Sequence, residues 1–504
     1  MKQAKFVPGR CVLAWLLAAL ALCWPAFVNG GGFFFPDSST YLREADAAVA
    51  ELTGWQSEWS DKRQLYLPHP AATNAARPAM PATPVPAAAA PPGPLHPVLL
   101  GRSVYYGLAV FPFITAFGSL GVVGFQALLA VFTVWLTLLA FGAPRARMPA
   151  LVLVTALALS ALTSLPFFVA MIMPDVFAGF AVALAVSACV GWKRLGMVER
   201  VGLVLLLTLC GMVHSSHVLL LAALAVLAAI AFHRAGLSAR PGWAAMLLAV
   251  VAGLVGEQAF VVAITHKMGQ PPVRPPFLTA RLVDDGPGLA MLRARCPAIG
   301  FEACRFQGRM PRDSDTFLWS QAPADGVFSV ESVDVQRRLA KQDVAFAIAT
   351  VRHDPLGVAR ASVGKAVKQL FLTKFNVFNS TGQPGSDTAF ANNLPARFKA
   401  QVLASRYASA GNPVQLSRWL NVLTALAAAL FLAAVTAGRT RERRAVAIRA
   451  GAALLLAAIA MNAAVTGTLS KPHDRYNVRI VWVLQLAALA ILAARRSPLV
   501  EQSK

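Results

Sequence analysis

A series of apolar runs constrains the fold of this 504-residue chain more than any other feature. The runs lie near residues 11 to 28, 120 to 142, 149 to 170, 176 to 191, 201 to 213, 218 to 232, 242 to 265, 417 to 437, 446 to 466 and 479 to 494. A helix needs about 20 apolar residues to cross the hydrocarbon of a bilayer, and several runs approach that length. With 57% hydrophobic and 14% charged residues, the composition also differs from that of soluble proteins. We therefore predict an all-α polytopic membrane protein with about ten transmembrane helices.

The basic residues between these runs indicate how the helices are oriented. They cluster in alternate short loops and at the C-terminal end, at Arg145 and Arg147; Lys193, Arg194 and Arg200; Arg234 and Arg240; Arg439, Arg441, Arg443 and Arg444; and Arg495 and Arg496. The positive-inside rule places such clusters in the cytoplasm, and with them both termini. Much of the net charge of +23 then reflects orientation, and binding to nucleic acid is not expected.

Two apolar segments need separate interpretation. Residues 104 to 118 are apolar, but a span there would reverse every later loop, so we predict a re-entrant or interfacial segment. The run from 11 to 28 has the features of a secretory signal or of a retained first span, and the spans that follow favour retention.

The predicted organisation has five parts. They are an N-terminal cytoplasmic tip and first span (1–29), a first extracytoplasmic loop (30–119), a transmembrane bundle (120–265), an extracytoplasmic domain (266–415) and C-terminal transmembrane helices (416–504). The first loop is expected to open with a helix capped by Ser38 or Ser39 and to continue as an Ala/Pro linker. Apolar spacing near 329 to 350 and 356 to 376 predicts that the extracytoplasmic domain is mainly helical.

Cys296 and Cys304 are the two cysteines of the predicted extracytoplasmic domain, and the other four lie within apolar runs. An oxidising compartment such as a periplasm permits a disulfide between them, and we predict one. A zinc site would need further ligands at standard spacing, and the sequence nearby has none.

Two acidic residues border apolar runs, and the orientation places both on the extracytoplasmic side. Asp37 lies in the segment from Phe33 to Tyr41, and Asp175 follows Pro174. Either acid can simply begin a helix, where the helix dipole favours it. Ionised groups near hydrocarbon are costly, however, and paired carboxylates can accept a proton, orient a hydroxyl or hold a metal. We interpret Asp37 and Asp175 as the candidate catalytic residues.

Histidines and arginines on the same side are candidates for binding a substrate phosphate. His214 and His217 enclose two serines, and His473, Arg475 and Arg479 lie in the last outer loop. Guanidinium groups bind phosphate oxygens in a bidentate manner, and imidazole can reach phosphate or metal. The alternatives are polar contacts between helices for the histidines, and binding of lipid headgroups for the loop.

Arg102 and Tyr105 are weaker candidates, at the start of the apolar segment that we predict to be interfacial. They are expected to line a mouth that leads to the site. An aromatic belt at the membrane interface also explains the tyrosine.

The acid of the first outer loop, the Pro-Asp acid of a later loop, the many spans and the long outer segment together resemble the GT-C class of lipid-dependent glycosyltransferases. The resemblance covers the architecture and two short motifs, Pro-Asp-Ser at Asp37 and Pro-Asp-Val-Phe-Ala-Gly at Asp175. It implies a polyprenyl-phosphate-linked sugar as donor, and a glycan, lipid or protein acceptor on the outer face of a membrane such as the bacterial inner membrane. Asp37 would be the base or a metal ligand, and Asp175 the second acid. Many members have two adjacent acids where this chain has Asp37 alone, so a divalent metal cofactor stays open.

Two other classes of function use similar residues. A transporter or flippase for a lipid-linked anion would also place acids, histidines and arginines around an aqueous cavity, but its internal repeats are not found in the sequence. A membrane acyltransferase with an intramembrane histidine would leave both acidic motifs unexplained. The sequence therefore favours the glycosyltransferase.

Overall fold

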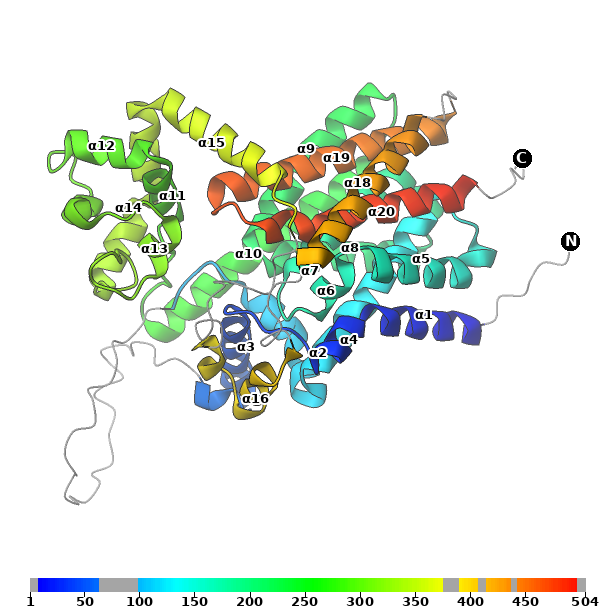
Figure 1. The fold of residues 1–504 in the computed structure, drawn as a ribbon, viewed down its shortest axis with the longest axis horizontal. Coiled ribbons are helices and arrows are strands. Elements are labelled where there is room, and N and C mark those ends of the chain that lie inside the picture. Colours follow the sequence, from blue (N-terminus) through cyan, green and yellow to red (C-terminus); the bar gives the residue numbers. More distant parts are fainter. Residues whose placement is uncertain (1–7, 63–97, 375–388, 407–413, 437–441, 496–504) are drawn as a thin grey trace, which may run out of the picture. The chain divides into compact units, whose positions relative to one another are not determined.

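The computed structural model describes residues 8–62, 98–374, 389–406, 414–436 and 442–495 (Figure 1). Within these ranges the chain is helical, and its β-structure is limited to two isolated bridges. The prediction of an all-α protein is therefore confirmed. The chain forms two compact units, one of Met1–Lys62, Ser103–Leu254 and Ser362–Lys504, the other of Arg63–Arg102 and Val255–Ala361.

The first unit is a helical bundle. Its helices are α1 (Pro8–Leu22), α2 (Trp24–Asn29), α3 (Ser38–Thr53), η1 (Ser60–Lys62), α4 (Val104–Phe141), η3 (Arg145–Arg147), α5 (Met148–Leu162), α6 (Leu165–Ala170), α7 (Asp175–Gly191), η4 (Trp192–Arg194), α8 (Met197–Val213), α9 (Ser215–Arg234), η6 (Ala389–Asn393), α16 (Ala396–Leu403), α18 (Val414–Thr436), α19 (Arg443–Leu469) and α20 (Asp474–Arg495). Both α10 (Arg240–Met268) and α15 (Pro355–Leu370) cross from one unit to the other. All residues of α7 are buried, and this central helix packs against α4, α19 and α20.

Seven helices in the described ranges are long and apolar enough to cross a membrane: α4, α5, α7, α9, α10, α19 and α20. They support the prediction of a polytopic membrane protein. Three further predicted spans, near 11 to 28, 201 to 213 and 417 to 437, correspond to α1, α8 and α18.

Two apolar runs that we predicted as continuous spans are broken. The run from 11 to 28 divides into α1 and α2, and the run from 149 to 170 divides into α5 and α6. Each second helix has a proline, Pro25 or Pro166, in its first turn. Proline lacks the N–H that would continue a preceding helix, but it suits a first turn. The predicted helices were therefore too long at their C-terminal ends.

Gly118 reverses the direction of α4. Its φ of 66° and ψ of −161° are not helical, and the rings of Phe113 and Phe125 lie 4.4 Å apart. In a straight helix these residues would be separated by about 18 Å along the axis. The segment before Gly118 therefore folds back on the helix that follows, as expected if residues 104 to 118 do not simply lengthen the span at 120 to 142.

The first half of α4 packs closely on α3, and this contact leads to a stability prediction. A Cβ at Gly107 would lie 2.0 Å from the carbonyl oxygen of Tyr41. Gly107→Ala is expected to destabilise the protein by about 1–3 kcal/mol because the two helices must separate. The control is Gly124→Ala in the same helix, where the new Cβ meets nothing within 4 Å. It is expected to be neutral or stabilising by about 0.5–1 kcal/mol. Thermal unfolding in detergent measures both, and equal midpoints would contradict the close contact.

The second unit is also helical. It contains α11 (Phe277–Asp285), α12 (Pro287–Arg295), η5 (Glu302–Arg309), α13 (Ser314–Trp319) and α14 (Val333–His353). A helical domain in this region was predicted, but with the range 266 to 415. The unit ends at Ala361, and the residues after it belong to the bundle.

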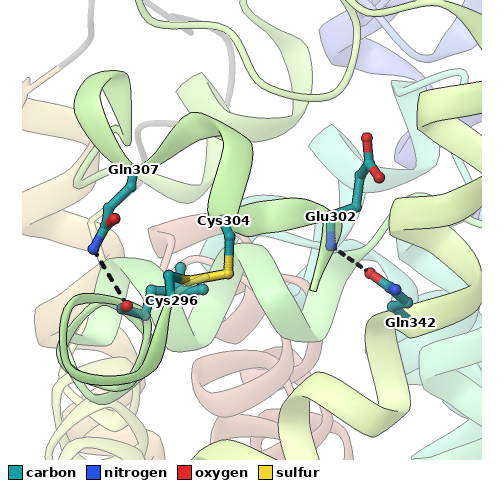
Figure 2. Close-up of a disulfide and its surroundings, with 6 residues drawn as sticks. Cys296, Glu302, Cys304, Gln307 and Gln342 are labelled. Carbon is teal, nitrogen blue, oxygen red and sulfur yellow. Dashed lines mark hydrogen bonds between the residues drawn. A yellow bond between two sulfur atoms is a disulfide. The ribbon is translucent and has the colours of Figure 1, made fainter. Parts of the chain in front are cut away.

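The predicted disulfide between Cys296 and Cys304 is present in this unit (Figure 2). It joins the end of α12 to η5, with the two Cα atoms 5.6 Å apart. Beside it, the backbone N–H of Glu302 donates to the side chain of Gln342 at 2.7 Å (Figure 2). The disulfide and this hydrogen bond fix η5 against α12 and α14.

Candidate functional site

The loops that carry the two acidic motifs are joined through their backbones. Phe33 and Met171 form a β-bridge, in which the backbone N–H and C=O of Phe33 make hydrogen bonds of 2.8 and 2.9 Å to the other loop. Each of these residues lies four positions before its acid, Asp37 or Asp175. Two segments far apart in sequence are therefore held side by side.

Asp37 is the N-cap residue of α3, and its side chain is half-buried. We predicted that Ser38 or Ser39 caps this helix, and the structure shows otherwise. The hydroxyl of Ser38 accepts from the N–H of Phe35 at 2.8 Å and donates to the carbonyl of Ile172 at 2.7 Å. Ser39 also bonds back to the loop. The serines thus fasten the loop of Asp37 to the neighbouring loop, and the side chain of Asp37 makes no capping hydrogen bond.

Asp175 begins α7, as predicted, and lies against two arginines at the start of α20. Its side chain is 3% exposed, and its Oδ1 lies 3.3 Å from Nη1 of Arg479 and 3.4 Å from Nε of Arg475. The other terminal nitrogen of Arg479 donates to the side-chain oxygen of Asn462, in α19, at 3.4 Å. Arg475 and Arg479 are one helical turn apart, so one face of α20 directs both guanidinium groups to the same carboxylate.

The charges of this cluster are not balanced by Asp175 alone. The side chain of Arg479 is buried and that of Arg475 is 12% exposed, and both contact one buried carboxylate. Nε and Nη1 of Arg475 and Nε of Arg479 are buried and make no hydrogen bond within the described residues; Nε of Arg475 lies 3.4 Å from Asp175 as an ion-pair contact only. A buried donor without a partner costs about 1–3 kcal/mol, and more when it is charged. An anion that accepts from these groups would offset that cost, so the cluster is a candidate anion-binding site.

Aromatic rings connect the arginines to the loop of Asp37. The guanidinium of Arg475 lies 4.4 Å from the ring centre of Phe35, and that of Arg479 lies 5.0 Å from the ring of Tyr476. Such contacts are favourable because a ring face is negative. The carboxylate of Asp37 interacts electrostatically with Arg475. The acid and the candidate anion site therefore belong to one cluster.

His214 and His217 lie at the junction of α8 and α9, with their rings 5.3 Å apart. Nδ1 of His214 accepts from the N–H of Ser216, and His214 interacts electrostatically with Asp175 and Asp37. Nδ1 of His217 lies 2.9 Å from the carbonyl oxygen of Cys210, and its buried Nε2 has no partner in the described ranges. Because a carbonyl only accepts, Nδ1 of His217 carries the proton and Nε2 of the neutral ring is an acceptor. The predicted contact of His217 with a phosphate oxygen would need the protonated ring, which donates at both nitrogens.

The remaining predicted residues make other contacts. Nδ1 of His473 accepts from the backbone N–H of Arg475 at 3.1 Å, so this histidine shapes the turn before α20. Tyr105 is half-buried in the first turn of α4. Arg102 belongs to the second unit, where its guanidinium lies 5.4 Å from the ring centre of Trp319.

Three residues of the cluster had no assigned role in the sequence. Phe35 and Tyr476 lie inside segments that we singled out, and only the fold shows that their rings meet the arginines. Asn462 did carry a signal, because a lone amide within an aliphatic span usually has a partner in the bundle. Its Nδ2 donates to the carbonyl of Tyr476 at 2.8 Å, which ties α19 to the start of α20.

A metal ion has no ligand set in the part of the chain that the structure describes. No group of three or more His, Cys, Asp or Glu side chains there is arranged to hold one. Asp175, the best candidate, is already in contact with two cations. The described residues therefore offer no support for the divalent metal that the sequence left open.

Comparisons with protein-family models, curated proteins and solved structures found no significant match to this chain. Its function is therefore argued from the geometry of the cluster.

Proposed function

We propose that this protein is a membrane glycosyltransferase that moves a sugar from a polyprenyl-phosphate donor to an acceptor on the extracytoplasmic face. The observation that carries the proposal is the pair of Arg475 and Arg479, whose three buried nitrogens make no hydrogen bond within the described part of the chain, beside the loop of the half-buried Asp37. A phosphate that departs from a sugar is an anion, and transfer to a hydroxyl requires a base. The cluster offers both groups.

The proposed reaction is a displacement at the anomeric carbon of the sugar. The acceptor oxygen forms a bond to that carbon while the bond between carbon and phosphate oxygen breaks. Asp37 takes the proton of the acceptor hydroxyl, and the lipid phosphate leaves with the electron pair of the broken bond. Arg475 and Arg479 stabilise the negative charge that develops on the phosphate.

Asp175 has a different role in this proposal from the one the sequence suggested. Its carboxylate is already in contact with both guanidinium groups, so it is poorly placed to share the acceptor proton. It holds the arginines in position instead. The alignment of charged groups before the substrate binds is what makes such a site effective.

The proposed topology has ten spans, with both termini in the cytoplasm of a bacterium and the site at the outer face of its inner membrane. The seven long apolar helices support it, together with α1, α8 and α18. Asp175 and Arg475 both lie in the first turn of their spans, and His214 directly precedes α9. The clusters of basic residues at the other ends of these helices, and the disulfide of the second unit, agree with this orientation.

Sugar transfer in membranes that contain the native acceptors tests the proposal, with polyprenyl-phosphate sugars as donors. Arg475→Gln is expected to reduce transfer by about 10²–10³-fold, because one stabilising group for the phosphate is lost. The control is Arg338→Gln, which removes an exposed arginine that pairs with Glu302 in the second unit. It is expected to keep the wild-type rate. Thermal unfolding of Arg475→Gln separates lost chemistry from lost structure.

Two outcomes contradict the proposal. Transfer that Arg475→Gln leaves undiminished would exclude the arginine pair from the reaction. Movement of labelled donor across a proteoliposome membrane, with its sugar still attached and no transfer, would identify a flippase.

A further inference from the structure

The C-terminal half of α15 carries an apolar stripe that the proposed function does not use. Val363, Val367 and Leu370 of α15, and Phe371 directly after it, expose 63, 50, 38 and 76% of their surface. Spacings of four and three residues place them on one face of a helix. An apolar surface of this kind usually marks a binding surface for protein or membrane.

The opposite side of the same helix is fixed to the ends of two spans. The fully buried side chain of Gln369 donates to the carbonyl of His473 at 2.9 Å and accepts from its N–H at 2.8 Å. The side chain of Asn477 donates to the carbonyl of Gln369 at 2.5 Å. A Cβ at Gly467 would lie 2.8 Å from the carbonyl oxygen of Lys365. The last turns of α15 therefore contact the end of α19 and the start of α20.

These contacts place the stripe beside the loop that joins two candidate spans. Both α19 and α20 are long and apolar enough to cross a membrane, so we expect the loop between them, from Ser470 to His473, at one of its surfaces. A helix packed against that loop lies at the depth of the lipid headgroups. Apolar side chains at this depth can enter the acyl region.

The charge of the segment indicates which surface it fits. Residues 355 to 374 contain four cations and no acidic residue; the cations are Arg360, Lys365, Lys368 and Lys374. Lys368 is exposed and lies about 100° around the helix from Val367, on the flank of the stripe. Each such cation near anionic headgroups strengthens partitioning of a segment to the membrane by about fivefold.

We propose that the C-terminal half of α15 docks on the membrane surface, with its apolar stripe among the lipid chains and its lysines at anionic headgroups. Through Gln369, the docked helix also supports the turn that precedes Arg475. The proposal does not depend on glycosyl transfer, because it rests only on α15 and its contacts with α19 and α20.

Single-cysteine variants of the full chain in lipid vesicles test this docking. The background variant lacks the free cysteines Cys11, Cys23, Cys189 and Cys210 and keeps the disulfide. An environment-sensitive fluorophore is attached to it at Val367→Cys. The control carries the fluorophore at Lys368→Cys. Thermal unfolding confirms that each variant is folded. Spin-labelled lipids are expected to quench the fluorophore at position 367 by about two- to fivefold more than at position 368.

Two results would overturn the docking. Equal, weak quenching at both positions means that the stripe faces water. A fluorophore at position 367 that is shielded from water but not quenched by lipid means that a protein, or a second copy of the chain, covers it.

A second measurement tests whether the docked segment prefers anionic headgroups. Quenching at position 367 is compared in phosphatidylcholine vesicles with and without phosphatidylglycerol. We expect stronger quenching with phosphatidylglycerol, and we expect Lys365→Gln with Lys368→Gln to remove that increase. Lys341→Gln, an exposed lysine of α14, is the control and is expected to retain it. Quenching that does not respond to phosphatidylglycerol would exclude the anionic lipid as partner.

Discussion

Replacing Asp37 with asparagine is expected to reduce sugar transfer by about 10²–10⁴-fold, the usual contribution of a general base. The amide has nearly the shape of the carboxylate but cannot take a proton from the acceptor. The side chain of Asp37 is half-buried and the amide is nearly isosteric with it, so the fold is expected to survive the change. Transfer is measured in membranes at matched expression, with the polyprenyl-phosphate donor in excess.

Asp61→Asn is the matched control for this experiment. Asp61 is an exposed acid of η1 in the same unit, so its replacement changes the net charge equally without altering the cluster. Asp61→Asn is expected to retain the wild-type rate. Undiminished transfer by Asp37→Asn would remove this carboxylate from the mechanism. An equal loss in both variants would point to a general effect of charge.

Asp175→Asn is expected to lower the free energy of unfolding by about 3–5 kcal/mol. The change removes the buried negative charge that faces Arg475 and Arg479, and it leaves the guanidinium of Arg479, whose side chain is 3% exposed, without its carboxylate. Thermal or denaturant-induced unfolding in detergent measures the loss. An isosteric amide is used so that packing around α7 stays constant.

A double variant distinguishes an electrostatic cause from a steric one. Arg479→Met removes one of the two cations, so Asp175→Asn should cost less in that background than in the wild type. Glu302 provides the comparison: it pairs with two exposed arginines, Arg305 and Arg338, and Glu302→Gln is expected to cost about 0–1 kcal/mol. An unfolding midpoint that Asp175→Asn leaves unchanged would show that the arginines do not depend on this carboxylate.

The features that could be predicted from the sequence are those with a local cause. Apolar runs predicted the helices, Pro174 and the dipole of the following helix fit the start of α7 at Asp175, and the two cysteines outside the apolar runs predicted the disulfide of Cys296 and Cys304. Each of these depends on residues that are close in sequence or on the solvent around them. Such local features can be recognised in one sequence without knowledge of the fold.

The features that escaped prediction depend on contacts between distant segments. Ser38 was expected to cap α3, but its hydroxyl donates a hydrogen bond to the carbonyl of Ile172 instead. Asp175 was interpreted as a second catalytic acid, and its contacts with two arginines of α20 could not be predicted. Gln369 carried no signal, and its partner His473 is about a hundred residues away. Spacing along one chain does not determine which loops meet.

The pairing of Phe33 with Met171 has a consequence for how this site can vary. The hydrogen bonds use peptide groups and no side chain, so many different residues at these two positions would keep the acidic loops in register. Proline at position 33 is the exception, because it has no N–H to donate. Substitutions at positions 33 and 171, apart from proline at 33, are therefore expected to leave the spacing of the two acidic loops unchanged.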